Sequence, residues 1–150
     1  MASKGLPADL RAAVVALLRD GNQRLTPNRE ALLEVLHRAR TRPLTIPEIV
    51  AERPSLAVST VYRNLTVLED AGVVHRIVAR GGHAYYELVE DLTEHHHHMV
   101  CTRCGLVEDV PATPTIEKSV NDAVRQIARS TGFRTEHHRL DLLGVCKRCA

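Results

Sequence analysis

The hydrophobic pattern of the first half of the chain predicts four helices. Residues 8–20 carry apolar side chains at helical spacing, and Gly21 and Asn22 interrupt it. Thr26 and Pro27 begin a second helix, because threonine is a favourable N-cap and proline suits the first helical position. The buried stripe of this second helix is expected to consist of Leu32, Leu33, Val35 and Leu36.

The third and fourth helices have different signals. Residues 45–48 (T-I-P-E) form a capping box that predicts a short helix to about Glu52. Residues 59–69 place apolar side chains at i, i+4 and i+7, so this fourth helix should have an inner and an outer face. The inner face is expected to comprise Val61, Leu65 and Leu68, and the outer face Ser59, Tyr62, Arg63 and Thr66.

A β-hairpin is predicted next. Residues 73–78 indicate a strand, residues 80–82 (R-G-G) a turn, and residues 84–88 a return strand. Three helices followed by a hairpin are typical of a winged helix-turn-helix. The pattern therefore predicts an N-terminal winged-helix domain.

The second half of the chain is expected to form a smaller α/β unit. Short strands at 99–100 and 106–110 flank a Cys-x-x-Cys knuckle, and a last strand at 133–145 leads to Cys146. Between them, residues 115–130 predict a helix ending at Gly132. That helix is expected to bury Ile116, Val120, Val124 and Ile127.

Composition narrows the class of protein. The chain has 150 residues, 44% of them apolar, and Phe133 is its one phenylalanine, so the core should be aliphatic. A net charge of +2 is too small to indicate nucleic-acid binding by itself. No signal peptide and no run of about 20 apolar residues is present, which predicts a cytoplasmic protein without membrane association.

The four cysteines occur as two Cys-x-x-Cys pairs, Cys101/Cys104 and Cys146/Cys149. This spacing is typical of a zinc ion bound by four thiolates, which leaves no open position for catalysis. A redox dithiol would need a βαβ setting, which the pattern lacks. Structural zinc contributes about 10–16 kcal/mol to small domains, so the ion could decide whether this part folds.

Four consecutive histidines, His95–His98, precede the first cysteine pair. Purification tags lie at termini and this run is internal; a solvated polar loop is the simpler alternative. In an extended strand His95 and His97 would face one way and His96 and His98 the other, so one run could serve two metal sites. Candidate further ligands are His75, His83, Glu87, Glu90, Asp91, Glu94, Glu108, Asp109, Glu117, His137 and His138.

The outer face of the fourth helix is a candidate for DNA reading. Tyr62 can pack on a thymine methyl or bond a phosphate, and Arg63 can bond guanine or a phosphate. Arg24 could reach the DNA backbone, and Arg76 and Arg80 would lie on the wing. The alternative is an ordinary solvated helix face.

The motifs of metal-dependent hydrolases are missing. The sequence contains no H-E-x-x-H, no deaminase-type H-x-E and no nucleophile elbow, which argues against an enzyme. Two further classes stay open: a metal-storage protein or metallochaperone, and a structural zinc module that joins partner proteins.

Together these segments resemble the ferric uptake regulator (Fur) family of bacterial metal-dependent repressors. The matching segments are Arg24–Arg29 (R-L-T-P-N-R), Ser59–Arg63 (S-T-V-Y-R), Ala71–Val74, the Gly81-Gly82 turn leading to Tyr86–Leu88, His95–Gly105 and Gly144–Cys149.

The resemblance implies an α+β protein with a winged-helix domain at 1–88, a hinge at 89–94, and a dimerisation and metal-binding domain at 95–150. It implies a homodimer that binds a palindromic operator in double-stranded DNA when metal-loaded and represses metal-uptake and homeostasis genes. No small organic substrate is expected. The DNA-contacting residues are expected to be Arg24, Ser59, Thr60, Tyr62 and Arg63.

The resemblance also implies three metal positions. The structural Zn²⁺ site corresponds to Cys101, Cys104, Cys146 and Cys149. A dimerisation-domain site corresponds to His95, His97, Glu117 and His138. The regulatory hinge site corresponds to His75, Glu87, His96 and His98.

The fourth hinge ligand bears on which metal is sensed. Iron and peroxide sensors similar to this family take a histidine from the segment before the third helix, which here reads Thr41–Leu44. The zinc-sensing (Zur) branch takes a ligand from the first wing strand, where His75 stands, although its cysteine is replaced by Val89. His75 therefore favours Zn²⁺ as co-repressor, with Fe²⁺, Ni²⁺ and Mn²⁺ as alternatives. Peroxide sensing is a further alternative, against which Pro43 argues.

Overall fold

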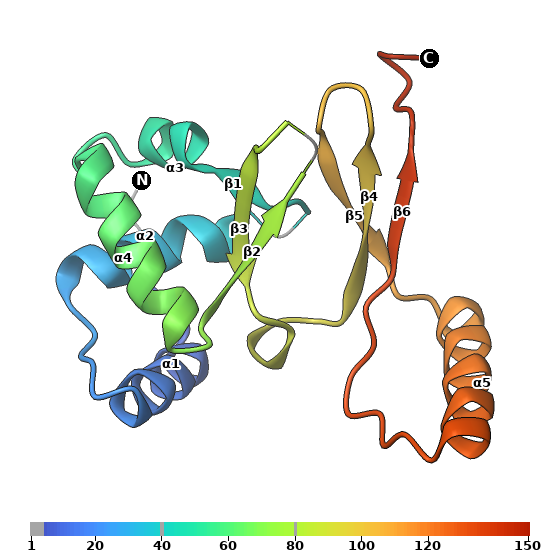
Figure 1. The fold of residues 1–150 in the computed structure, drawn as a ribbon. Coiled ribbons are helices and arrows are strands. Elements are labelled where there is room, and N and C mark those ends of the chain that lie inside the picture. The colour runs from blue at the N-terminus through green and yellow to red at the C-terminus, as the bar shows by residue number, and fades with distance from the viewer. Residues whose placement is uncertain (1–4, 40, 80) are drawn as a thin grey trace.

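Two three-stranded sheets, joined by a short 3-10 turn, organise the chain in the computed structural model (Figure 1). The structure describes residues 5–39, 41–79 and 81–150. The N-terminal elements are α1 (Ala8–Asp20), α2 (Pro27–Arg38), β1 (Leu44–Thr45), α3 (Ile46–Glu52), α4 (Val58–Asp70), β2 (Val74–Val78) and β3 (Ala84–Leu88). The C-terminal elements are η1 (Glu90–Leu92), β4 (His96–Cys101), β5 (Val107–Pro111), α5 (Pro114–Thr131) and β6 (Asp141–Gly144).

Capping side chains begin the helices where the sequence predicts. The Thr26 hydroxyl accepts the Arg29 backbone N–H at 3.4 Å, and the Thr45 backbone N–H donates to the Glu48 carboxylate at 2.8 Å. Each cap satisfies a backbone donor that a helix start leaves unpaired. The predicted starts of α2 and α3 are therefore confirmed.

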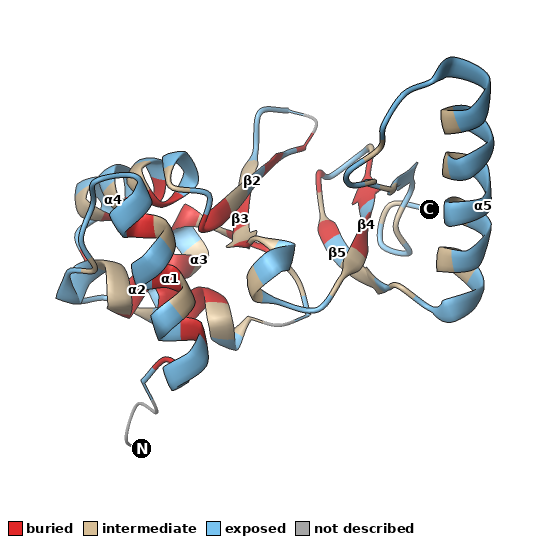
Figure 2. Cartoon of the chain, turned by 90° about the horizontal axis from the view of Figure 1, so that it is seen from below, coloured by how far each residue is buried: buried red, intermediate tan, exposed pale blue. Residues whose placement is uncertain are grey.

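The aliphatic core lies in the N-terminal half. Val61, Leu65 and Leu68 of α4 are buried, as predicted, and belong to the same hydrophobic cluster as buried leucines and valines of α1 and α2. Figure 2 shows the buried positions concentrated in this half, whereas α5 carries intermediate and exposed residues. The N-terminal half thus has a hydrophobic core of its own.

The N-terminal sheet has the order β1-β3-β2, with antiparallel pairs. The predicted hairpin of β2 and β3 is confirmed. Strand β1 was not predicted, because its two residues are too short to show a periodic pattern; Leu44 pairs with Tyr86 and Thr45 with Tyr85. Arg80, expected on the wing, lies outside the described residues.

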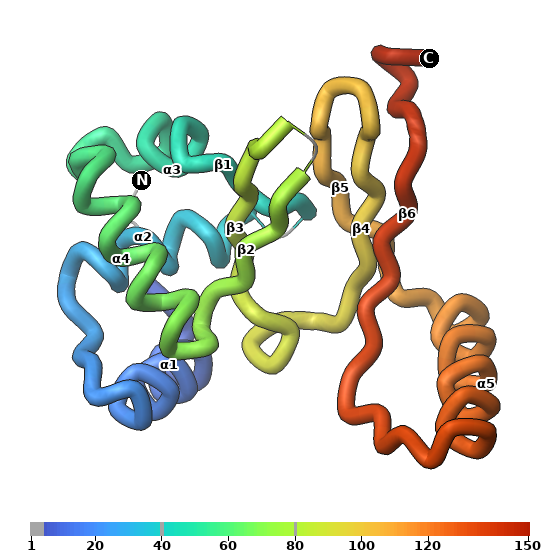
Figure 3. The backbone as a smooth tube through the Cα atoms, viewed as in Figure 1, coloured from blue at the N-terminus to red at the C-terminus, as the bar shows by residue number. Residues whose placement is uncertain are grey.

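The C-terminal sheet has the order β5-β4-β6, so the histidine strand is central (Figure 3). Strand β4 is antiparallel to β5 and parallel to β6, and His98 lies opposite both Asp109 and Asp141. The pairing with β5 fixes the directions of His96, His97 and His98, and β6 adds a second partner from His98 onward.

Two expectations for this half are wrong. Helix α5 forms, but none of its residues is buried; the Ile127 side chain is 54% exposed, because no other described element packs on the apolar stripe. The last strand begins at Asp141 rather than 133, since β4 meets this segment only from His98 onward, where its N–H donates to the Leu140 carbonyl. None of the described helices is long and apolar enough to span a membrane.

Candidate metal centres

Three groups of potential metal ligands lie in or beside the C-terminal sheet. In each group the ligand atoms lie within 4.8 Å of one another. The cysteine group is Cys101, Cys104, Cys146 and Cys149; the histidine group is His95, His97, Glu117 and His138; the hinge group is Glu87, His96, His98 and Asp109.

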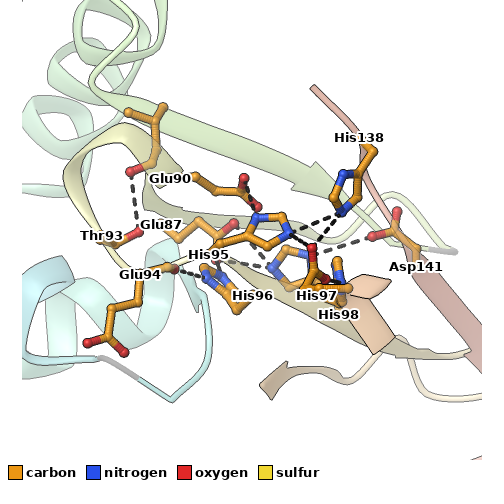
Figure 4. A network of polar contacts seen from close by, with 12 residues as sticks. Glu87, Glu90, Thr93, Glu94, His95, His96, His97, His98, His138 and Asp141 are labelled. Atoms are coloured by element: carbon orange, nitrogen blue, oxygen red, sulfur yellow. Dashed lines mark hydrogen bonds and ion pairs between the residues drawn. The ribbon is translucent and has the colours of Figure 1, made fainter. Parts of the chain in front are cut away.

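Strand β4 supplies ligands to two groups because successive side chains of a strand point to opposite faces. His97 contacts Glu117, and His95 contacts His138, on one face. His96 and His98 both contact Glu87 on the other (Figure 4). The alternation expected from the sequence is present in the structure.

The hinge group is built around the Glu87 carboxylate. Its Oε2 lies 3.2 Å from Nε2 of His96 and 3.2 Å from Nε2 of His98. Burial alone would raise the pKa of Glu87, but hydrogen bonds from both imidazoles lower it to about 2. The hydrogen bond to Glu87 raises the pKa of His96 to about 9. The group therefore holds a buried carboxylate whose negative charge is stabilised by hydrogen bonds from two imidazoles.

Asp109 completes the hinge group from β5. Its Oδ1 lies 3.9 Å from Nε2 of His98, and burial raises the pKa of its carboxyl. This buried oxygen has no hydrogen-bond partner among the described residues. A buried carboxylate oxygen without a partner is costly, and a cation bound by the group would satisfy it. The donor set therefore fits a divalent metal.

His75, the expected fourth hinge ligand, is not in this group. Its Nε2 lies 3.0 Å from Nη1 of Arg139 instead. Among the described residues, Asp109 and not His75 is grouped with Glu87, His96 and His98. Asp109 was one of many acidic candidates, and only the antiparallel register of β4 and β5, which sets it opposite His98, singles it out.

The histidine group brings together all four residues expected for the dimerisation-domain site. Nε2 of His97 lies 2.7 Å from Glu117, and Nε2 of His138 lies 3.3 Å from it. Nε2 of His95 faces Nε2 of His138 at 3.2 Å, so one of these nitrogens must present a lone pair. Hydrogen bonding from His97 lowers the pKa of Glu117 against the effect of burial. A cation fits between such donors.

Glu90, one of the candidate further ligands, contacts His95 and is not a member of any ligand group among the described residues. Its carboxylate lies 2.8 Å from Nδ1 of His95 (Figure 4). A carboxylate on one ring nitrogen leaves the other, Nε2, to face the ligand group. Glu90 therefore orients His95 from the 3-10 turn.

The four cysteines are free thiols, and their sulfur atoms lie within 4.8 Å of one another. The sulfurs of Cys104 and Cys146 are 3.8 Å apart. A tetrahedral zinc ion with Zn–S bonds of about 2.3 Å would place its sulfurs about 3.8 Å apart. Backbone hydrogen bonds from Cys104 and Cys146 lower the pKa of Cys101 to about 6, which favours the thiolate. The group fits zinc.

The candidate DNA-reading residues lie on the exposed side of α4 and the loop before α2. Tyr62 is 56% exposed, Ser59 and Arg63 are exposed, and Thr60 is half-buried at the start of the helix. Arg24 is exposed in the loop. The structure therefore places these side chains where a duplex could reach them.

Arg29 connects that loop to α4. Its guanidinium donates to the Arg24 carbonyl, to the Gln23 side chain at 3.2 Å and to the Asn64 side chain at 3.1 Å. Arg29 ends the R-L-T-P-N-R segment, from which no role for it was predicted. Its contacts fix the position of Arg24 relative to α4.

Comparisons with known proteins agree with this architecture. The sequence model of the Ferric uptake regulator family matches residues 20–143. The peroxide-responsive repressor PerR of Staphylococcus aureus (strain USA300) is 32% identical over 139 residues, covering 90% of this chain and 88% of the repressor. The Vibrio cholerae ferric uptake regulator structure has 30% identity and a TM-score of 0.67, with 87% of this chain and 98% of that chain covered. The Pseudomonas aeruginosa ferric uptake regulator with manganese has 29% identity and a TM-score of 0.69, with 88% and 96% covered.

Proposed function

Because the chain belongs to the ferric uptake regulator family, we propose that it is a metal-dependent repressor whose regulatory ion is held by the hinge group. Members of this family are dimeric, DNA-binding, metal-responsive regulators and not enzymes.

The observation that carries the proposal is the origin of the hinge ligands. Glu87 belongs to β3 of the N-terminal sheet, whereas His96, His98 and Asp109 belong to β4 and β5 of the C-terminal sheet. A single ion on this group would bind both halves of the chain. It would therefore stabilise one angle between the DNA-reading helix and the dimerisation unit.

We expect a homodimer because apolar surfaces of α5 and β6 are exposed in the single chain. The apolar stripe of α5 and the side chains of Leu142 and Leu143 on β6 are uncovered in the single chain. In a homodimer the two α4 helices would read half-sites about one helical turn apart, or a multiple, so the operator would be a palindrome. Metal coupling of 1–3 kcal/mol would change operator affinity about 5- to 150-fold.

Fe²⁺ or Mn²⁺ is the proposed co-repressor, with Zn²⁺ held at the cysteine group. The expectation of zinc sensing depended on a third nitrogen from His75, which here contacts Arg139. Two imidazoles and two carboxylates form a harder donor set, which Mn²⁺ and Fe²⁺ accept well. The manganese-containing Pseudomonas aeruginosa relative supports this choice.

Peroxide response is the second candidate function. It is supported by the 32% identity to a peroxide-responsive repressor. It predicts that the Fe²⁺-loaded protein, and not the Mn²⁺-loaded protein, loses operator binding after brief exposure to hydrogen peroxide. Mass spectrometry would then find added oxygen on a hinge histidine. Equal survival of both forms would exclude it.

The deciding experiment is a DNA-binding titration of protein with zinc at its cysteine group. Each of Fe²⁺, Mn²⁺, Ni²⁺ and Zn²⁺ is buffered near its cellular free concentration. At equal concentrations, Zn²⁺ would bind more tightly than Fe²⁺ or Mn²⁺ whichever metal is sensed. We expect Fe²⁺ or Mn²⁺ to promote operator binding. A response to Zn²⁺ alone would restore the original expectation, and metal binding without any operator preference would indicate a storage protein or metallochaperone.

A further inference from the structure

His75 lies beside the hinge group without belonging to it. It lies on β2 directly opposite Glu87 of β3, and its ring is half-buried. Opposite residues of an antiparallel pair share a face of the sheet, with Cβ atoms about 4.5–5.5 Å apart. His75 is therefore close enough for a change of rotamer to bring its ring toward an ion bound by Glu87.

Arg139 occupies the ring nitrogen that such an ion would need. Its Nη1 lies 3.0 Å from Nε2 of His75. Arginine only donates hydrogen bonds, so Nε2 must be the acceptor and must use its lone pair for this contact. A metal ion would bond through the same lone pair. Arg139 and a metal thus compete for one nitrogen.

Arg139 is itself held in place by Asp141. The two side chains form a forked ion pair, with Nε–Oδ1 at 3.1 Å and Nη2–Oδ2 at 2.9 Å. Asp141 begins β6 opposite His98 in the register, and its Oδ1 lies 3.5 Å from Nδ1 of His98. Forked arginine–carboxylate pairs are directional and strong. The guanidinium is therefore anchored to the strand pair that presents a hinge ligand.

We infer that Arg139 determines the metal specificity of the hinge site by keeping His75 from binding the ion. The inference rests on the proposed function, since it takes the hinge group to hold the regulatory metal. With Arg139 present, the donor set stays at two imidazoles and two carboxylates. Without Arg139, His75 becomes available as a third imidazole, and a nitrogen-richer set favours Zn²⁺ over Mn²⁺.

The test compares Zn²⁺ and Mn²⁺ affinities in the full-length protein with zinc at its cysteine group. The variants are Arg139→Met, His75→Gln and the two combined, measured by competition with chelators of known affinity. Removing a positive charge would raise the affinity for both dications alike. The ratio of Zn²⁺ affinity to Mn²⁺ affinity therefore reports whether His75 has become a ligand. We expect the ratio to rise about tenfold or more in Arg139→Met and to return to the parent value in the double variant.

A spectroscopic measurement reports ligation directly. Co²⁺ serves as the probe, in a His95→Ala/His138→Ala background that weakens the histidine group. Proton NMR of the Co²⁺-loaded protein shows the N–H groups of bound imidazoles at strongly shifted positions. Arg139→Met should show one N–H resonance more than its parent, and the double variant should lose it.

Two variants serve as controls for the affinity ratio. Arg139→Lys retains a cationic donor and should keep the parent ratio, and His75→Gln alone should bind both metals as the parent does. An unchanged ratio in Arg139→Met, a rise that persists in the double variant, or weaker binding in His75→Gln would each overturn the inference. His96→Ala separates the two proposals: if it leaves binding of both metals intact, the hinge assignment itself is wrong.

Discussion

At the scale of single residues, His96 and Glu87 stabilise each other in their charged forms. The raised pKa of His96, about 9, means that the imidazole carries a proton at neutral pH in the metal-free protein. A raised folded-state pKa stabilises the metal-free fold fully below the unfolded value of 6.5, and this contribution is lost as pH rises through about 9. Metal binding must displace the same proton.

Metal binding at the hinge group should therefore release about one proton from His96 at pH 7. Apparent metal affinity should rise by up to about tenfold per pH unit between pH 6.5 and about 9, and operator affinity should follow. Titrations in weakly buffered solution with a pH indicator would count the protons. Affinity that is constant across this window would contradict the role of His96.

His96→Ala should abolish metal-dependent operator binding while the protein stays folded. The substitution removes a proposed ligand of the hinge group, and His96 belongs to neither the N-terminal core nor the cysteine group. Operator binding with and without the co-repressor metal, alongside circular dichroism, checks this. His83→Ala, which removes an exposed histidine on the wing turn, is the matched control and should bind as the parent does.

At the scale of elements, α4 should carry DNA binding independently of the metal groups. Arg63→Ala should weaken operator binding, by about 1–3 kcal/mol if Arg63 bonds a base edge. If Arg63 bonds a phosphate, the slope of log operator affinity against log salt concentration should instead decrease by about one. Metal binding by the protein should not change, because Arg63 lies in the N-terminal half, on the exposed face of α4. Glu69→Ala, on the last turn of α4, serves as the control.

Element boundaries were predicted well where a local signal sets them. The caps at Thr26 and Thr45 fix the starts of α2 and α3, and the apolar spacing of Val61, Leu65 and Leu68 gives the inner face of α4. The burial of α5 was not predictable in the same way. Its stripe shows only that the helix has an apolar face to cover, and the described residues leave that face without buried positions.

In the ligand groups too, features set by local sequence were predictable and features set by contacts between elements were not. Alternation along β4 is a local property, so the split of His95–His98 into two pairs followed from the sequence. The fourth member of the hinge group depends on the register between strands, which local sequence does not give. His75 was the expected ligand and Asp109 only one of several acidic candidates, and the pairing of β4 with β5 and the contact of Arg139 with His75 distinguish them.

At the scale of the whole molecule, the cysteine group joins the start and the end of the C-terminal half. Its two pairs are separated by the whole of β5, α5 and β6. This half has few buried apolar side chains, only Val100 and Val107 among its described valines and leucines. Zinc should therefore contribute a large share of its stability.

Cys146→Ser should prevent stable folding of residues 95–150 and dimerisation while the N-terminal helices persist. Analytical ultracentrifugation and zinc analysis would measure both effects. The parent protein stripped of zinc by a chelator should behave like the variant and, unlike it, recover when zinc is returned. A zinc-free variant that remains a well-folded dimer would show that the four thiols do not form the structural site.

The central position of β4 also restricts how this run of histidines can change in length. A single residue inserted between His96 and His97 would turn every later side chain to the opposite face. His97 would then join His96, and His98 would join His95, so both ligand pairs would be separated by one event. Insertion of two residues would leave each histidine on its own face. It would nevertheless move the two histidines of each pair about 13 Å apart along the strand, too far to share one ion. We therefore expect the run to tolerate no insertion between His96 and His97.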